Sequence, residues 1–292
     1  MLRQRVITAV LLLAVLLPCL FAPVTLPFAL FTLLAIAAAG WEWARLNPLA
    51  AAMAQRPVAA WASGALLGGL CLLWLARWPM PPRAALAGGT DPRLWQAGLL
   101  LWVVGLVIAL RAGPTGWPRL PTALRWLLGL SLLGLAWLAL VQARGIGVNF
   151  LLSVMAVVWT ADIAAYFSGR AFGRRKLAPQ ISPGKSWEGV YGGVLGVAVL
   201  ACVWLLLIDP RLPVDSPSLF RLLLQRGGAG LLLVGVLLLT ALGVCGDLFE
   251  SLVKRSAGVK DSSQLLPGHG GVLDRVDALL PVLPAALALI SW

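Results

Sequence analysis

Long apolar runs, separated by short polar breaks, extend along most of the chain. Residues 7–41 contain no charged side chain, and this run is too long for one membrane span of about 20 residues. Pro18, Pro23 and Pro27 interrupt it, so we predict two helices joined by a tight turn. Seven further apolar segments follow. The nine predicted spans are 6–22, 25–43, 58–76, 94–110, 123–142, 147–168, 189–208, 229–249 and 272–291.

This pattern predicts an all-helical, polytopic integral membrane protein. Of the 292 residues, 60% are hydrophobic and 12% are charged, against about 25% charged residues in a typical soluble domain. Lipid can solvate so much apolar surface, whereas a soluble fold of this length could not bury it. Arg3 and Arg5 precede the first run, as in a signal peptide, but a second span follows at once. We therefore predict a retained anchor.

The distribution of Lys and Arg predicts the orientation. With the N-terminus in the cytoplasm, 16 of the 23 Lys and Arg residues fall on the cytoplasmic side and 7 fall outside, which follows the positive-inside rule. Nine of the 16 lie in the two polar segments described below, so orientation and site location depend on the same residues. We divide the chain into an N-terminal transmembrane region of about five helices, 1–145, and a C-terminal catalytic region, 146–292.

The net charge of +12 favours contact with anionic lipid or phosphate. A soluble protein with this balance would suggest nucleic acid, but the hydropathy makes that partner a poor candidate and we predict none. Cys19, Cys71, Cys202 and Cys245 lie in apolar runs without a CxxC pair, so we predict neither disulfides nor a zinc site. The single histidine, His269, cannot build a multi-histidine site.

Two polar segments, 159–189 and 246–277, together hold seven of the eleven acidic residues. In the predicted topology both lie on the cytoplasmic face. Asp162 comes near the inner end of a span, and a charge at a span's centre costs roughly 2.5–3.5 kcal/mol on insertion scales. It shares a helical face with Trp159, Tyr166 and Gly169. We favour a polar pocket wall over the alternative, an interfacial ion pair with Arg170, Arg174 or Arg175.

The second segment begins where an apolar run ends. At helical spacing Asp247, Glu250, Ser251 and Lys254 form one stripe. A carboxylate at a membrane helix end, surrounded by cations, suits Mg²⁺, which takes one or two carboxylates and completes its shell with water and phosphates. The alternative is an ordinary surface pair between Glu250 and Lys254, with Asp247 in solvent.

A glycine-rich run, Pro-Gly-His-Gly-Gly at 267–271, follows. It cannot be helical, and its backbone can approach a ligand closely. Such a run before a helix start is a common phosphate cradle. It leads into Asp274, Arg275 and Asp277 and lies near Lys254, Arg255 and Lys260, which strengthens that interpretation.

Gly184-Lys185-Ser186 is similar to the end of a P-loop. The upstream glycine is missing at the required spacing, and no strand is expected before it, so we do not predict a P-loop. Lys185 and Ser186 remain candidate phosphate ligands. Together, these cations, carboxylates and glycines at a bilayer surface predict phosphoryl or nucleotidyl transfer to a lipid, without defining the nucleotide or the lipid.

The second segment resembles the signature of the phosphatidate cytidylyltransferases, also called CDP-diacylglycerol synthases. Its matching residues are Ser251, Lys254, Arg255, Lys260, Asp261, Pro267, His269, Gly270, Gly271, Asp274, Arg275 and Asp277. The first segment and the tripeptide Trp41-Glu42-Trp43 are also similar to that family. The matching residues of the first segment are Asp162, Tyr166, Gly169, Arg170, Gly173, Leu177, Pro179, Ser182, Pro183, Lys185, Trp187, Glu188 and Gly189.

The resemblance implies that CTP and phosphatidate give CDP-diacylglycerol and pyrophosphate, for phospholipid biosynthesis. It also implies Mg²⁺ at Asp247 and Asp274, a second metal ion for which K⁺ is a candidate, and an all-helical membrane homodimer. Catalytic roles would fall on Asp247, Asp274, Lys254, Arg255 and His269. Substrate-binding roles would fall on Ser182, Lys185, Ser186, Lys260, Gly270, Gly271 and Arg275. Supporting roles would fall on Asp162, Glu250, Asp261 and Asp277.

Other assignments fit less well. A CTP-dependent lipid kinase would use the same metal and cations but attack the γ-phosphorus, and the full signature argues against it. The DG…AR…G…D…D pattern of CDP-alcohol phosphatidyltransferases is not found. A transporter would place charges near the midplane, often in two related halves, whereas these acids cluster at one face. A purely structural subunit would not need so many acids and cations. The compact chain, without an N-terminal extension, favours a bacterial inner membrane, with the active site facing the cytoplasm.

Overall fold

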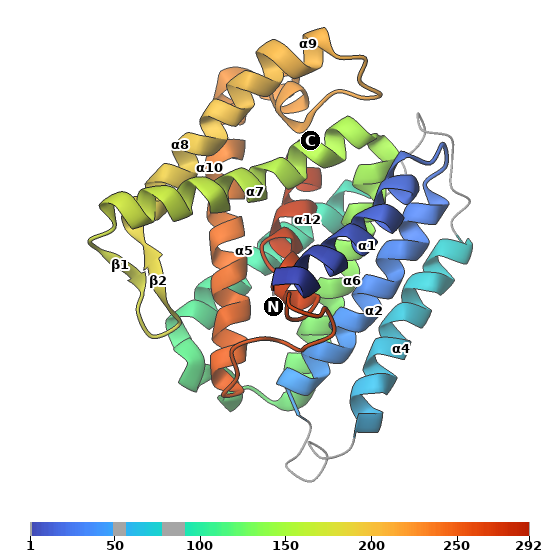
Figure 1. The fold of residues 1–292 in the computed structure, drawn as a ribbon, viewed down its shortest axis with the longest axis vertical. Helices are drawn as coiled ribbons and strands as arrows, with labels where there is room; N and C mark the ends of the chain where they lie inside the picture. Colours follow the sequence, from blue (N-terminus) through green and yellow to red (C-terminus); the bar gives the residue numbers. More distant parts are fainter. Residues whose placement is uncertain (1, 49–56, 78–90, 292) are drawn as a thin grey trace.

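Helices account for most of the protein, as the apolar runs predict. The computed structural model describes residues 2–48, 57–77 and 91–291, and Figure 1 shows them as a bundle of long helices with one short hairpin. The long helices are α1 (Leu2–Phe21), α2 (Leu26–Leu46), α4 (Pro57–Arg77), α5 (Pro92–Gly116), α6 (Thr122–Ile146), α7 (Val148–Phe172), α8 (Trp187–Val203) and α10 (Leu219–Ser256). The shorter elements are η2 (Trp117–Arg119), β1 (Lys176–Ala178), β2 (Ser182–Ser186), η3 (Trp204–Ile208), α9 (Asp209–Arg211), α11 (Leu273–Val276) and α12 (Leu279–Ile290).

Eight of the described helices are long and apolar enough to cross a membrane. They correspond to the first eight predicted spans, with α8 continued to Arg211. Many large apolar side chains on them are exposed, Leu34 at 70% and Leu195 at 66% among them, which suits a lipid-facing surface. The predicted all-helical membrane fold is therefore confirmed, while the cytoplasmic N-terminus stays a prediction. Arg56 and Arg83, which entered the charge count, lie outside the described residues.

The ninth predicted span, 272–291, folds differently from the other eight. It forms the single turn α11 and then α12, a helix of 12 residues whose side chains are all buried. At 1.5 Å per residue such a helix is about 18 Å long, shorter than the roughly 30 Å hydrocarbon core. Helices α5, α6, α7 and α10 pack around it, and Figure 1 shows it inside the bundle. The count of nine spans stays a prediction.

Helices α7 and α8 form the most closely packed pair because α8 presents glycines to α7. A Cβ atom added to Gly192 would lie 1.8 Å from Ser168 Oγ, and one added to Gly196 would lie 2.6 Å from Ala164 Cβ. Small residues of this kind let membrane helices approach closely. This close packing of α7 and α8 holds the hairpin that connects them near the C-terminal end of α7.

That hairpin was not predicted from the sequence. Strands β1 and β2 pair antiparallel, with Lys176 opposite Ser186 and Ala178 opposite Ser182. A strand therefore does lead into the helix at Gly184-Lys185-Ser186, contrary to our expectation. The glycine spacing of a P-loop is still missing, and the Ser186 hydroxyl accepts from the Gly189 amide, 3.2 Å away, as the N-cap of α8.

Helix α10 carries the second polar segment. It has 38 residues, with non-helical backbone at Gly227 and Gly228, and it continues past the predicted span to Ser256. Phe249 packs on the Trp43 ring of α2, with ring centroids 6.1 Å apart, and edge-on against Trp117. This aromatic contact holds the last turns of α10 against the N-terminal helices.

Candidate active site

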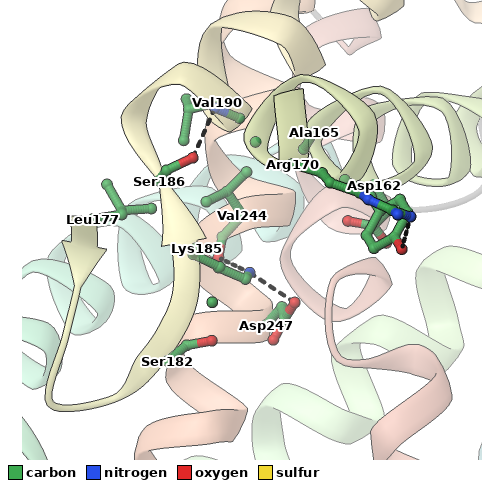
Figure 2. Close-up of a pocket in the computed structure, with 14 residues that line it drawn as sticks. Asp162, Ala165, Arg170, Leu177, Ser182, Lys185, Ser186, Val190, Val244 and Asp247 are labelled. Carbon is green, nitrogen blue, oxygen red and sulfur yellow. Dashed lines mark hydrogen bonds and ion pairs between the residues drawn. The ribbon is translucent and has the colours of Figure 1, made fainter. Parts of the chain in front are cut away.

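A cavity of about 460 Å³ lies between α7, strand β2, the start of α8, and α10. Asp162, Tyr166 and Gly169 line it from α7, in agreement with the predicted helical face, although Trp159 is not among the lining residues. Ser182, Lys185 and Ser186 line it from β2, and Asp247 from α10. We call it the hairpin pocket, and Figure 2 shows its side chains.

Lys185 and Asp247 meet in this pocket. The Lys185 Nζ lies 2.7 Å from Asp247 Oδ2, and both side chains keep about a quarter of their surface exposed, at 24% and 30%. The other oxygen, Oδ1, accepts from the Ser251 hydroxyl at 3.3 Å. The two predicted segments therefore come together through this ion pair (Figure 2).

Charged residues at the base of the hairpin bind one another rather than Asp162. Glu188 accepts from the backbone amides of Arg174 and Arg175 and pairs with the Arg175 guanidinium at 3.5 Å. Arg170 donates to the Tyr166 hydroxyl at 3.4 Å. Asp162 thus stands in the pocket wall, as the favoured interpretation expects, and not in the interfacial ion pair.

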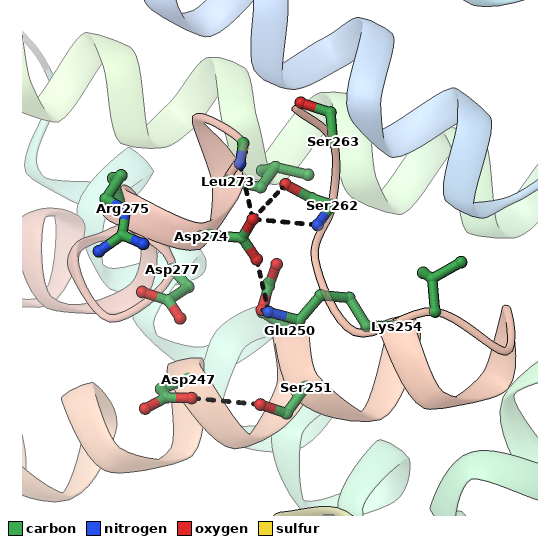
Figure 3. Close-up of polar contacts among 12 residues, drawn as sticks. Asp247, Glu250, Ser251, Lys254, Ser262, Ser263, Leu273, Asp274, Arg275 and Asp277 are labelled. Carbon is green, nitrogen blue, oxygen red and sulfur yellow. Dashed lines mark hydrogen bonds and ion pairs between the residues drawn. The ribbon is translucent and has the colours of Figure 1, made fainter. Parts of the chain in front are cut away.

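A second group of acids surrounds Lys254, about two turns after Asp247 on α10 (Figure 3). The Lys254 ammonium forms an ion pair with Glu250 and lies 2.6 Å from Asp274 Oδ1. All three side chains are nearly buried, at 12%, 5% and 7% exposure. The sequence alternative of an ordinary surface pair is therefore wrong, since the pair is buried and includes Asp274.

Asp274 accepts several hydrogen bonds from the loop that precedes α12. Its Oδ2 accepts from the Ser262 amide and hydroxyl, both at 3.0 Å, and from the Gly271 amide at 2.7 Å. Burial opposes ionisation, but hydrogen bonds from Lys254, Gly271 and Ser262 outweigh it and hold the pKa of Asp274 below its usual range. Asp274 is therefore a carboxylate at neutral pH.

The pKa of Asp277 shifts in the opposite direction from that of Asp274. Burial, and then the nearby charge of Asp247, raise the pKa of Asp277 to about 7. A Cβ atom on Gly246 would lie 2.7 Å from the Asp277 carbonyl oxygen, so this glycine lets the turn lie directly on α10. Figure 3 shows Asp277 between Asp274 and Asp247.

The glycine-rich run is non-helical, as predicted. Gly268 and Gly270 have φ values of 78° and 83°, which suit glycine. The Arg275 guanidinium donates to the His269 carbonyl, its Nε at 2.9 Å. The His269 Nδ1 is buried with no hydrogen-bond partner among the described residues. The phosphate-binding roles given to Gly270, Gly271, Arg275 and His269 stay predictions.

Other predicted residues lie apart from the hairpin pocket. Lys260 and Asp261 line a separate hollow of about 550 Å³ with Arg45, Ser263 and Gln264. Arg255 reaches instead to the Ile181 carbonyl in the hairpin loop, at 3.5 Å. The structure thus distributes the predicted residues over the hairpin pocket, the Lys254 group and this outer hollow.

The charged groups of the hairpin pocket and of the Lys254 group suit a divalent cation. Four acidic side chains, Asp247, Glu250, Asp274 and Asp277, face two lysines, Lys185 and Lys254, so the acidic groups outnumber the cations. Among the described residues no group of three or more His, Cys, Asp or Glu is arranged to hold a metal. Mg²⁺ needs only one or two carboxylates, so the donor chemistry suits this ion.

Sequence reasoning assigned no role to Glu42 on α2, although it noted the tripeptide that contains it. Glu42 is fully buried and bonded to the loop that holds Asp274. A signal was present, since Glu42 is the first acidic residue of the chain and lies inside a predicted span. An ionisable residue within a span is a functional candidate.

A family profile and two known proteins match this chain over nearly its full length. The profile of the cytidylyltransferase family matches residues 3–292. The phosphatidate cytidylyltransferase of Pseudomonas aeruginosa (strain PAO1) is 38% identical over 299 positions, which cover 99% of this chain and 97% of that protein. The phosphatidate cytidylyltransferase of Haemophilus influenzae is 38% identical over 296 positions, or 97% and 96% of the two chains. That of Brucella suis is 44% identical over 168 positions, or 56% and 53%. This chain therefore belongs to the cytidylyltransferase family.

Proposed function

We propose that this protein transfers the cytidylyl group of CTP to phosphatidate, giving CDP-diacylglycerol and pyrophosphate. One observation carries the proposal: the two signature segments meet at the end of α10, where Lys185 pairs with Asp247 beside an open pocket. Relatives named phosphatidate cytidylyltransferase match this chain over nearly its full length, which supports the same substrates here.

The reaction needs positioning and charge neutralisation more than proton transfer. A phosphate oxygen of phosphatidate, already ionised near neutral pH, would attack the α-phosphorus of CTP. The bond from that phosphorus to the oxygen bridging to the β-phosphorus would break, and pyrophosphate would leave. Lys185 in the pocket wall would bind the phosphates and offset their charge, together with Lys260 and with Arg255, which reaches to the hairpin loop. His269 would bind phosphate rather than act as a base.

We further propose a Mg²⁺ ion held by Asp247 and Asp274, with Asp277 beside them, and a second ion for which K⁺ is a candidate. Bound Mg²⁺ would neutralise charge on the reacting phosphates and the leaving pyrophosphate. The excess of carboxylates over lysines supports this proposal. Because Lys254 and three loop donors already bind Asp274, Asp247 has the more accessible oxygen atoms.

The surroundings of the enzyme form part of the proposal. We place it in the bacterial inner membrane with the active site facing the cytoplasm, where CTP is found, and we expect a homodimer. The exposed apolar surface and the excess of basic residues near the site support a membrane location with that orientation.

The test is a label-transfer assay on the purified protein in detergent with phosphatidate and Mg²⁺. Label from [α-³²P]CTP should move into a chloroform-soluble product, and Asp247→Asn and Asp274→Asn should each lower the rate by about 100-fold or more. Asp91→Asn is the matched control, because Asp91 caps α5 away from the site and Asn caps helices equally well. Transfer of γ-label to lipid would instead identify a lipid kinase, and no transfer of either label would refute the proposal.

A further inference from the structure

Glu42 connects the first half of the chain to the loop that carries the candidate active site. It lies on α2 with 0% of its surface exposed. Its Oε1 accepts from the Ser263 hydroxyl at 2.5 Å and the Val272 amide at 2.9 Å. Its Oε2 accepts from the Ser262 hydroxyl at 3.2 Å and the Leu273 amide at 2.7 Å. One side chain thus binds both ends of the segment 262–273.

All four partners of Glu42 are N–H or O–H donors. A carboxylate only accepts hydrogen bonds, so it can satisfy every one of them. An amide in its place would turn an NH₂ group toward donors and leave part of this buried network unpaired. Among the described residues no Lys or Arg forms an ion pair with Glu42, so the loop donors are its recorded partners.

The segment that Glu42 holds is the one that positions Asp274. Ser262 contacts both carboxylates: its hydroxyl, with one proton to share between them, lies 3.2 Å from Glu42 Oε2 and 3.0 Å from Asp274 Oδ2, and its amide donates to Asp274. Gly271 lies directly against Ser262 and Glu42, since a Cβ atom there would be 1.9 Å from Ser262 Oγ and 2.5 Å from Glu42 Oε1. Gly271 therefore has a structural requirement of its own, beside any contact with substrate. Asp274 in turn binds Lys254 at 2.6 Å.

We propose that Glu42 is a positioning residue for cytidylyl transfer: through Ser262 and the amides of Val272 and Leu273 it holds Asp274 against Lys254. This inference rests on the proposed function. Glu42 touches no reacting group, so its loss should affect the rate of the chemical step more than substrate binding. The N-terminal region then contributes to the active site through the loop 262–273.

The test compares Glu42→Gln with Thr32→Val in the full-length protein purified in detergent. Thr32 is a matched control because it is a buried polar residue on the same helix, bonded to Trp137 and remote from the loop. For Glu42→Gln we expect kcat to fall about 100-fold, the effect of a small misplacement of catalytic groups, with both KM values within about twofold. Its melting temperature should match that of the control.

Hydrogen exchange provides a readout that does not depend on activity. In Glu42→Gln, amides of 262–273 should exchange faster while the rest of α2 stays protected, and Thr32→Val should leave that loop unchanged. Wild-type kcat in Glu42→Gln would overturn the proposal, as would a loss of kcat that only follows a loss of folded protein. If the wild type failed to convert CTP, the proposed function would fall, and unchanged exchange in the loop would separately overturn the role of Glu42.

Discussion

Two lysines bind the acids of the candidate site, but in different surroundings. Lys254 lies between Glu250 and Asp274, with all three side chains nearly buried, whereas Lys185 and Asp247 keep about a quarter of their surface exposed. Removing one partner of a buried ion pair leaves an uncompensated charge and costs about 3–5 kcal/mol. A partly exposed pair contributes at most about 1 kcal/mol, because solvent screens it.

We therefore predict that Lys254→Met and Lys185→Met both lose activity but differ in stability. Each should lower the rate of label transfer by about 100-fold, since each removes a cation near the phosphates. Only Lys254→Met should markedly lower the melting temperature, measured by tryptophan fluorescence. A Lys185→Met protein that melted lower than Lys254→Met would contradict this assignment of the two environments.

The raised pKa of Asp277 predicts that the stability of the protein depends on pH. Burial and the charge of Asp247 raise this pKa to about 7 from its ordinary value of 3.8. An acid with a raised pKa favours the folded state when protonated, and that contribution is lost as the pH rises through 7. In EDTA, Asp277→Asn should therefore gain stability relative to the wild type between pH 5 and pH 8. A difference in melting temperature that stays constant over this range would rule out the raised pKa.

Charged residues in an apolar chain are easy to identify, so the sequence placed Asp247, Lys254 and Asp274 in one polar segment, and the structure brings Lys254 and Asp274 into contact. The sequence did not predict the partners of each residue. The pairing of Lys185 with Asp247, and of Glu42 with Ser262, joins positions 62 or more residues apart. Spacing along a helix says nothing about such contacts, because they depend on how the helices pack.

At the scale of elements, apolar length predicted eight long helices, whereas the ninth predicted span does not form one long helix. Residues 272–291 are apolar enough for a span, yet they fold as α11 and the buried α12. Hydropathy cannot distinguish a lipid-facing helix from one enclosed by other helices. The hairpin of β1 and β2 was missed because its strands have 3 and 5 residues and show no alternating apolar pattern.

The glycine face of α8 predicts a clear effect of side-chain size. Gly192→Leu or Gly196→Leu should separate α8 from α7, because even a Cβ atom would lie 1.8 Å or 2.6 Å from the nearest atom of α7. Overpacking of this kind costs about 1–3 kcal/mol, and it would move Asp162 away from Lys185. We expect a lower melting temperature and reduced label transfer. Gly69→Ala on α4 is the control, since nothing lies within 4 Å of its Cβ position, and an equal loss there would refute the argument.

At the scale of the whole molecule, the two halves defined from sequence are joined by several contacts. Helix α12, from the C-terminal half, packs against α5 and α6 of the N-terminal half, and Phe249 of α10 packs against Trp43 of α2. Glu42 adds a polar connection between the halves. The division at residue 145 stays a prediction, and these contacts lead us to expect that the C-terminal half alone would lack a complete site.

The orientation in the membrane can be tested independently of activity. Helix α8 begins at the hairpin, and with its continuation forms a candidate span that ends at Arg211, so these two ends should lie on opposite sides of the bilayer. In a cysteine-free background, a membrane-impermeant maleimide should label Arg211→Cys on spheroplasts, and label Gly184→Cys only after the membrane is opened. Gly184 has open space around its Cβ position, so the new side chain fits. The reverse labelling would place the hairpin pocket outside, away from cytoplasmic CTP, and labelling of both proteins on closed spheroplasts would mean that α8 does not cross the membrane.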